Sequence, residues 1–117
     1  VECALCVMDV SFISQKLILP VLPPLLSDNG ILISLIKPQF ECGRSGLSKN
    51  GIVKDWRIRR DAVRGVVEAA AAVDLAPVGL MRSPVSGGDG NIEFLLCCRL
   101  GGTKSVDEQR ILEVCRQ

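Results

Sequence analysis

The sequence is poor in aromatic residues and contains no histidine. Aromatic residues make up 3% of the 117-residue chain, and tyrosine is absent. A core built from this chain must therefore be aliphatic, and a zinc site with imidazole ligands is excluded. No apolar run reaches the roughly 18 residues that a transmembrane helix needs. The start of the chain also lacks the basic-then-apolar pattern of a signal peptide. We therefore expect a cytoplasmic protein, or an organellar one if the source is eukaryotic, without a membrane partner.

The charge balance is close to neutral, but the basic residues are unevenly spread. A net charge of +1 gives no strong overall field to attract nucleic acid. A basic patch can follow phosphates, yet a solvated helix face has the same appearance in a sequence. Charge alone therefore leaves RNA binding open. The basic residues of the middle third are Lys37, Arg44, Lys49, Lys54, Arg57, Arg59, Arg60 and Arg64.

The cysteines are predicted to be reduced and structural. The chain has 6 of them, and most lie inside apolar runs, where a free cysteine behaves as a small hydrophobic residue. Cys3 and Cys6 form a C-x-x-C pattern, which redox enzymes place at a helix N-terminus. Here the pattern falls in the apolar segment 3–8, which is typical of a buried strand. A redox function at this pair is the less favoured alternative.

The first third of the chain predicts two buried strands separated by a short helix. Residues 3–8 and 31–37 are continuous apolar runs of the kind found in parallel sheets. Between them, apolar residues recur at roughly helical spacing after Ser11 or Ser14, either of which can act as N-cap. The segment "SDNG" then predicts a stop before the second strand. The helix should be kinked or shortened by Pro20, Pro23 and Pro24.

The rest of the chain alternates in the same way after a long glycine-rich loop. Asp55 can cap a helix whose apolar stripe includes Val63 and Val66. Ser105, followed three residues later by Glu108, resembles a capping box for a closing helix. Strands are predicted over 76–83 and 91–100, joined by the turn 84–90.

This order predicts one α/β domain with a mostly parallel sheet and helices on both faces. The last two strands are joined by a short turn, so they should be antiparallel. Ligands of such sheets lie beyond the carboxyl ends of the parallel strands, where Asp9 and Lys37 stand. Glu93 begins the antiparallel strand, so it should come to the same edge. A buried carboxylate needs a partner, and Lys37 is the expected one for Glu93.

Four blocks of the sequence resemble a known family. "MDVSFIS", "LIKPQFE", "GIVKD" and "SPVSGGDGNIEFLL" occur in the order and approximate spacing of the TlyA (hemolysin A) family, over about residues 5–100. This family consists of FtsJ-like ribosomal RNA 2'-O-methyltransferases that use S-adenosylmethionine. The resemblance implies a Rossmann-like methyltransferase sheet, represented by its C-terminal half, in residues 1–117.

The resemblance also implies a set of site residues. The family has a Lys-Asp-Lys-Glu tetrad, whose last three members match Asp9, Lys37 and Glu93. The first lysine and the cofactor loop have no counterpart in this chain. The implied roles are activation or alignment of the ribose 2'-hydroxyl by Lys37 and orientation of Lys37 by Glu93. Asp9 would orient the other lysine and contact the cofactor.

Three further residues are candidates for substrate binding: Gln39, Phe40 and Asn91. Each has an alternative role in supporting its own loop. The expected partners are ribosomal RNA or ribosomal subunits, with no metal. A second copy is a further expected partner, because a sheet without its first strands exposes an edge. A different class of function, a noncatalytic RNA-binding domain, stays open as the alternative.

Overall fold

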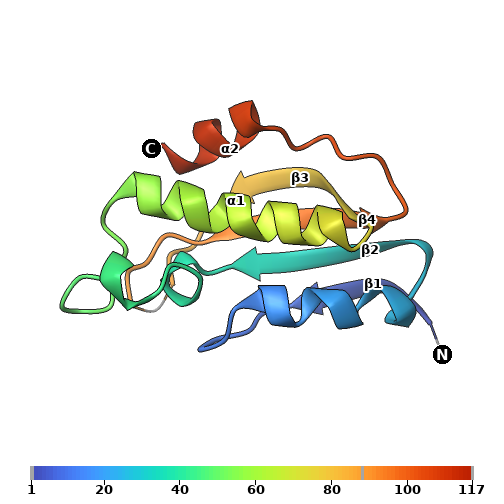
Figure 1. Cartoon of the computed structure of the whole chain (residues 1–117), viewed down its shortest axis with the longest axis horizontal. Coiled ribbons are helices and arrows are strands. Elements are labelled where there is room, and N and C mark those ends of the chain that lie inside the picture. Colours follow the sequence, from blue (N-terminus) through green and yellow to red (C-terminus); the bar gives the residue numbers. More distant parts are fainter. Residues whose placement is uncertain (1, 88, 117) are drawn as a thin grey trace.

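The fold is a four-stranded sheet with two helices packed on it (Figure 1). The computed structural model describes residues 2–87 and 89–116. The strands lie side by side in the order β1-β2-β4-β3. Their bounds are Cys3–Met8 for β1, Leu26–Ile36 for β2, Leu75–Arg82 for β3 and Phe94–Leu100 for β4.

The directions of the strands confirm the predicted α/β class. β1 pairs parallel to β2, whereas β4 pairs antiparallel to both β2 and β3. Three strands therefore run one way, and the last strand of the chain runs against them. Met8 pairs with Ser34, and Ile36 pairs with Phe94. The carboxyl ends of β1 and β2 consequently meet the beginning of β4 at one edge.

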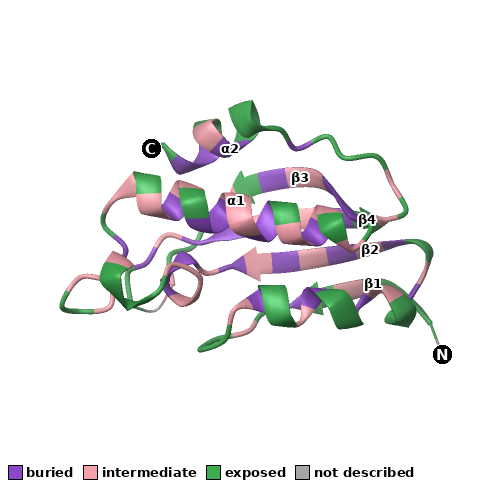
Figure 2. Cartoon of the chain, viewed as in Figure 1, coloured by how far each residue is buried: buried purple, intermediate pink, exposed green. Residues whose placement is uncertain are grey.

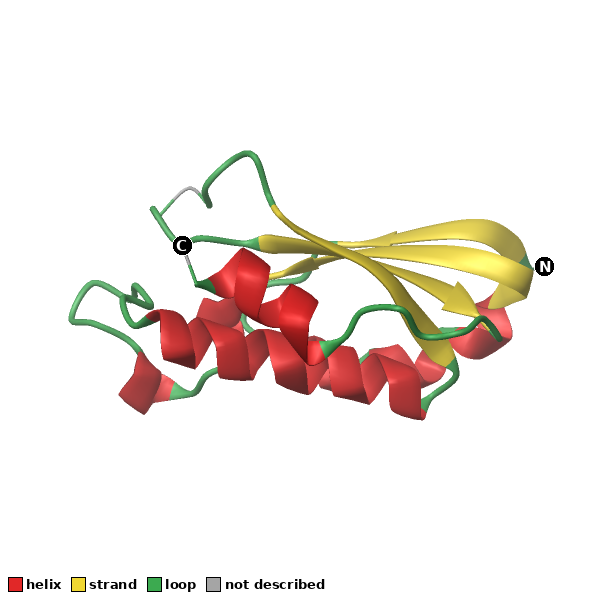
Figure 3. Ribbon diagram, turned by 90° about the horizontal axis from the view of Figure 1, so that it is seen from above, coloured by secondary structure: helices red, strands yellow, loops and turns green. Residues whose placement is uncertain are grey.

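The helices lie on one face of the sheet (Figure 3). α1 spans Trp56–Ala72 and α2 spans Glu108–Cys115. The expectation of helices on both faces is therefore wrong for the described residues, because the second helix also packs beside the first. The predicted stripe on α1 is confirmed. It is fully buried against the sheet at Val63, Val66, Val67 and Ala70.

The segment between β1 and β2 forms three short 3₁₀ helices instead of one α-helix. These are η1 (Gln15–Leu17), η2 (Leu19–Val21) and η3 (Pro23–Leu25). Proline has no N–H and clashes with the preceding turn, so the prolines of this segment restrict it to short i→i+3 turns. Ser14 caps η1 by accepting a hydrogen bond from the Lys16 N–H. The predicted shortening and one of the two predicted caps are thus confirmed.

Three predicted boundaries differ from the structure. β2 begins at Leu26, ahead of the "SDNG" segment, but residues 27–30 have no strand partner among the described residues and Asn29 has φ 61°, so regular pairing starts at Ile31. Ser105 donates to the Val78 carbonyl, and Asp107 caps α2 in its place. β4 begins at Phe94, so Glu93 precedes the strand. The turn predicted over 84–90 includes residue 88, which lies outside the described residues.

The far face of the sheet is apolar and partly exposed. The burial pattern along β2 alternates between buried and intermediate residues, as Figure 2 shows. A shallow apolar hollow of about 360 Å³ lies over β3 and β4 and includes Met81, Leu95 and Cys97. On β1, Leu5 and Val7 are exposed. Such continuous apolar strands are typical of sheets covered on both faces. No helix in the described residues is long and apolar enough to cross a membrane.

The burial of two cysteines predicts their reactivity. All the cysteines are free, and Cys98 and Cys115 are buried, whereas Cys3 is exposed. Burial raises the pKa of the Cys98 thiol to about 12 and that of Cys115 to about 11. Only a thiolate reacts quickly with iodoacetamide. At pH 8 we therefore expect mass spectrometry to find Cys3 alkylated first, and Cys98 and Cys115 only after unfolding. Equal rates at all three would contradict the burial.

The same shifts predict a loss of stability in alkali. A thiol whose folded pKa is raised stabilises the fold fully below its unfolded pKa. That contribution is lost as the pH rises through the folded pKa. The free energy of unfolding should therefore fall between about pH 8.5, the ordinary thiol pKa, and the raised folded values. Cys98→Ala should flatten this fall in urea titrations, and an unchanged slope would contradict the assignment.

Candidate active site

Lys37 is held in place directly after β2. Pro38 follows it and begins a short turn, η4 (Pro38–Phe40), because proline cannot continue the strand ladder. The Lys37 side chain is only 14% exposed. Its ammonium lies 2.5 Å from Asp9 Oδ1 and donates a hydrogen bond to Ser11 Oγ at 2.9 Å. The register of β1 against β2 causes this contact, since the two strands end side by side.

The partner of Lys37 differs from the predicted one. Asp9 pairs with Lys37, whereas Glu93 accepts a hydrogen bond from Gln39 Nε2 at 3.1 Å. Lys37, Gln39 and Glu93 nevertheless line one cavity of about 210 Å³. The structure thus brings the predicted residues to one edge of the sheet, with two separate polar pairs in place of the predicted Lys37–Glu93 pair.

Two phenylalanines stand beside this cavity. Phe12 is 90% exposed, and its ring centroid lies 4.8 Å from that of Phe40 at a tilt of 50°. Both also line a larger cavity of about 570 Å³, together with Arg44 and Asn50. The backbone of Phe12 has φ 64°, a conformation that is unfavourable for a bulky residue and that clusters at functional sites. Sequence reasoning missed Phe12, although an aromatic residue just beyond a strand end is a usable signal in a chain with few aromatics.

A buried polar network fixes the loops that carry these groups. Glu41 accepts hydrogen bonds from Ser14 Oγ at 2.6 Å and from the Gln15 N–H at 2.9 Å. Gln15 in turn donates to the Leu35 carbonyl and accepts from Ser34 Oγ. The network joins the loop after β1 to the loop after β2. Sequence reasoning did not find it, because such pairings depend on tertiary contacts.

Asn91 is almost completely buried and joins two further loops. Its Oδ1 accepts from the Val53 N–H at 2.9 Å, and its Nδ2 donates to the Gly51 carbonyl and to Asp89 Oδ2. Donation from the backbone and side chain of Asn91 lowers the pKa of the Asp89 carboxyl. Both of its amide atoms are used within the protein, so the structure places Asn91 as a support for the wall of the larger cavity.

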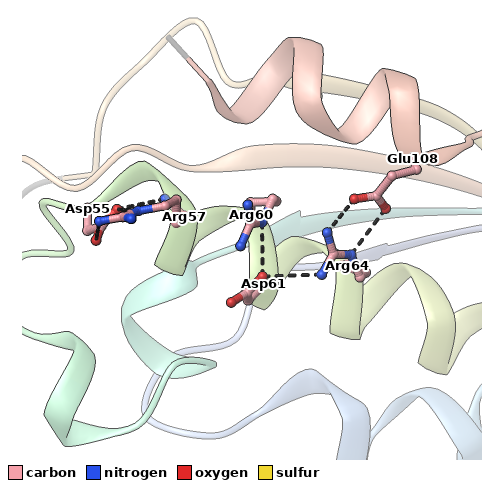
Figure 4. A network of polar contacts seen from close by, with 6 residues as sticks. All are labelled: Asp55, Arg57, Arg60, Asp61, Arg64 and Glu108. Atoms are coloured by element: carbon pink, nitrogen blue, oxygen red, sulfur yellow. Dashed lines mark hydrogen bonds and ion pairs between the residues drawn. The ribbon is translucent and has the colours of Figure 1, made fainter.

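Part of the basic cluster on α1 is paired with acidic residues (Figure 4). Arg60 and Arg64 both contact Asp61, and Arg64 also binds Glu108 at the start of α2. This guanidinium lowers the pKa of the Glu108 carboxyl. The contacts favour a solvated helix face over a continuous phosphate track along α1. In the described part of the chain no ion pair engages Arg44, Lys49 or Lys54, which are exposed, and Arg44 lines the larger cavity.

The described residues contain no cluster of His, Cys, Asp or Glu side chains that could hold a metal ion. The edge of the sheet brings together the Lys37 ammonium, the carboxylates of Asp9 and Glu93, and the rings of Phe12 and Phe40.

Comparison with known proteins identifies the family. The FtsJ-like methyltransferase family matches residues 1–100, and the chain belongs to this family. YqxC of Bacillus subtilis is 49% identical over 89 residues, which cover 76% of this chain and 32% of that protein. The 16S/23S rRNA (cytidine-2'-O)-methyltransferase TlyA of Mycobacterium tuberculosis is 37% identical over 95 residues, covering 81% and 35%.

Solved structures agree with this assignment. A protein of Lactococcus lactis that carries the name hemolysin superposes with a TM-score of 0.90 at 38% identity. The match covers 99% of this chain and 56% of that one. A similarly named protein of Streptococcus thermophilus gives a TM-score of 0.89 at 40% identity, covering 97% and 42%. The chain thus spans about one third of the curated relatives and about half of the solved ones.

The network around Glu41 leads to a stability prediction. Glu41→Ala leaves the Ser14 hydroxyl and the Gln15 N–H without their acceptor, which should cost about 1–3 kcal/mol of folding free energy. Hydrogen exchange of the Gln15 backbone amide should also be faster in Glu41→Ala. Glu68→Ala, an exposed change on α1, is the matched control. Equal stability of the two variants, measured by urea unfolding, would show that the network does not hold the loops.

Proposed function

We propose that the protein transfers a methyl group from S-adenosylmethionine to a ribose 2'-hydroxyl of ribosomal RNA, with Lys37 aligning or activating that hydroxyl. The observation that carries the proposal is the Lys37 side chain at the carboxyl edge of the sheet, which is 14% exposed and whose ammonium is fixed by Asp9 and Ser11. The family membership and the 2'-O-methyltransferase TlyA among the relatives support the same reaction.

The reaction needs a group that controls one proton. A 2'-hydroxyl is a weak acid and a poor nucleophile, so it must be oriented and must lose its proton as the O–C bond forms and the C–S bond breaks. An ammonium beside the hydroxyl favours its ionised form, and a neutral amine could accept the proton directly. Asp9 and Ser11 fix the position of Lys37 Nζ, so alignment adds to the effect.

The cofactor supplies the methyl group, and this chain offers one residue that suits it. S-adenosylmethionine carries a cationic α-amino group, for which a carboxylate is the natural partner. The Asp9 side chain is 60% exposed, and Oδ1 is the oxygen that contacts Lys37. β1 is the outermost strand on this side of the sheet. In this proposal Asp9 provides the acidic contact for the amino group of the cofactor.

The cavity next to Lys37 suits an unstacked nucleotide. Proteins that recognise single-stranded RNA stack its bases on aromatic side chains. Phe12 and Phe40 offer such surfaces, and Arg44, an exposed cation that lines the larger cavity with them, can neutralise a neighbouring phosphate. In this proposal Phe40 contacts the substrate, and Asn91 shapes the cavity wall from behind.

Substitution of Lys37 tests the proposal. Lys37→Ala should lower the rate of methyl transfer to ribosomal RNA by about 100-fold or more, because the group controlling the proton is gone. Glu93→Gln should also lower it. Transfer of a labelled methyl group measures both, and Lys104→Ala, an exposed lysine without an ion pair among the described residues, is the control. Unchanged transfer in Lys37→Ala would refute the role of this residue. RNA binding without any transfer by the wild type would favour a noncatalytic domain.

We also propose that the 117-residue chain on its own associates with a second copy through β1. This strand lies at the edge of the sheet, and its Leu5 and Val7 side chains are exposed. Edge strands of this kind pair readily, and a lysine placed on them prevents it. Sedimentation should show a dimer that Val7→Lys dissociates, whereas Leu17→Lys, an exposed position on η1, should leave it intact. A monomer at all concentrations would contradict this.

A further inference from the structure

The buried side chain of Gln39 lines the same cavity as Lys37, and its amide is hydrogen-bonded to Glu93. Gln39 and Glu93 are 8% and 7% exposed. The Gln39 amide donates to a Glu93 carboxylate oxygen, which lies 54 positions further along the chain. The reverse orientation of the amide would place its carbonyl oxygen against the carboxylate, so the charge of Glu93 fixes the direction of the donor.

The carboxylate of Glu93 occupies the space that a side chain at position 87 would need, and that position is a glycine. A Cβ atom at position 87 would lie 2.7 Å from Glu93 Oε2 and 3.1 Å from its carboxyl carbon. No real Cβ approaches so closely, so the bare backbone at this position is what allows the carboxylate to lie where it does. Glu93 is thus held between an amide donor and a close backbone surface.

A second buried glutamine provides an internal comparison. Gln15 uses both ends of its amide in the fold, because Nε2 donates to the Leu35 carbonyl and Oε1 accepts from Ser34. Gln39 uses only Nε2, and its buried Oε1 has no partner among the described residues. An unsatisfied buried acceptor destabilises a protein. Gln39 therefore contributes less to stability than Gln15, which suggests that its contact with Glu93 serves the site.

We propose that Gln39 is the positioning residue of Glu93. Its amide, together with the bare backbone at Gly87, holds the carboxylate in one orientation on the wall of the cavity shared with Lys37. The inference rests on the proposed methyl transfer and gives Gln39 an indirect role in place of a contact with RNA. Without the amide, the carboxylate could turn toward the Lys37 ammonium and compete with Asp9 for it.

The kinetic test compares Gln39→Met with Glu93→Gln and the double variant. Gln39→Met keeps the size of the side chain and removes the donor, so kcat should fall about 10- to 100-fold, the loss expected for one hydrogen bond to a charged group. The KM for RNA should not change. In the Glu93→Gln background the same change should cost nothing further. A raised KM at constant kcat, or losses that multiply in the double variant, would overturn the inference.

Gly87→Ala tests the other side of the same carboxylate. The added Cβ must displace the free end of the Glu93 side chain, so kcat should fall as in Gln39→Met while the thermal midpoint changes little. Gln15→Met is the matched control, since it should lower the thermal midpoint strongly. Unfolding of Gln39→Met at the temperature of Gln15→Met would mean that Gln39 is merely structural and would overturn the inference.

A measurement without catalysis separates this inference from the proposed function. The side-chain amide protons of Gln39 should exchange slowly in nuclear magnetic resonance spectra of the wild type, compared with those of the exposed Gln109. They should exchange quickly in Glu93→Ala. Fast Gln39 exchange in an active wild-type protein would overturn this inference alone. An inactive wild type would overturn the proposed function and, with it, the catalytic meaning of the contact.

Discussion

The carboxylate of Glu41 is the contact on which the geometry of the site depends. It accepts hydrogen bonds from Ser14 and from the Gln15 backbone, and Gln15 reaches the buried Ser34 in the middle of β2. The loop after β1 and the loop after β2 would otherwise be two independent surface segments. Buried polar groups that satisfy one another fix a unique arrangement, because any other arrangement leaves one of them unpaired. This link fixes the loops that carry Phe12 and Phe40, whereas Lys37 is placed by the register of β1 against β2.

The site keeps its charged groups in separate pairs. Lys37 is bound by Asp9 on the β1 side, and Glu93 is bound by the neutral amide of Gln39. The charge of Lys37 is balanced by Asp9, whereas the neutral amide of Gln39 leaves the charge of Glu93 uncompensated. With the carboxylate occupied by a neutral donor, the ammonium and the carboxylate can act on different atoms within one cavity. Electrostatic effects of this kind are strong only where the groups are fixed and water is largely excluded.

Much of the fold could be predicted from the sequence, and the exceptions have physical causes. Continuous apolar runs predicted the strands, and the rule that parallel strands end at one edge placed Asp9 and Lys37 together. The predicted N-cap of α2 was wrong. Ser105 donates its hydroxyl to the Val78 carbonyl, and Asp107 caps the helix instead. The partner of Lys37 could not be chosen from the sequence either. That choice depends on strand register and on side-chain reach, which no local pattern contains.

The apolar far face of the sheet has a consequence for the behaviour of the chain in solution. Colloidal stability depends on electrostatic repulsion between molecules, and a chain with a net charge of +1 and an isoelectric point near 7.7 has little of it at neutral pH. The exposed side of α1 carries the charged residues Arg57, Asp61 and Glu68, whereas the opposite face of the sheet presents Val7 and Met81 to water. The solubility of the 117-residue chain on its own should therefore be lowest near neutral pH. It should improve as the pH moves away from the isoelectric point, independently of any catalytic group.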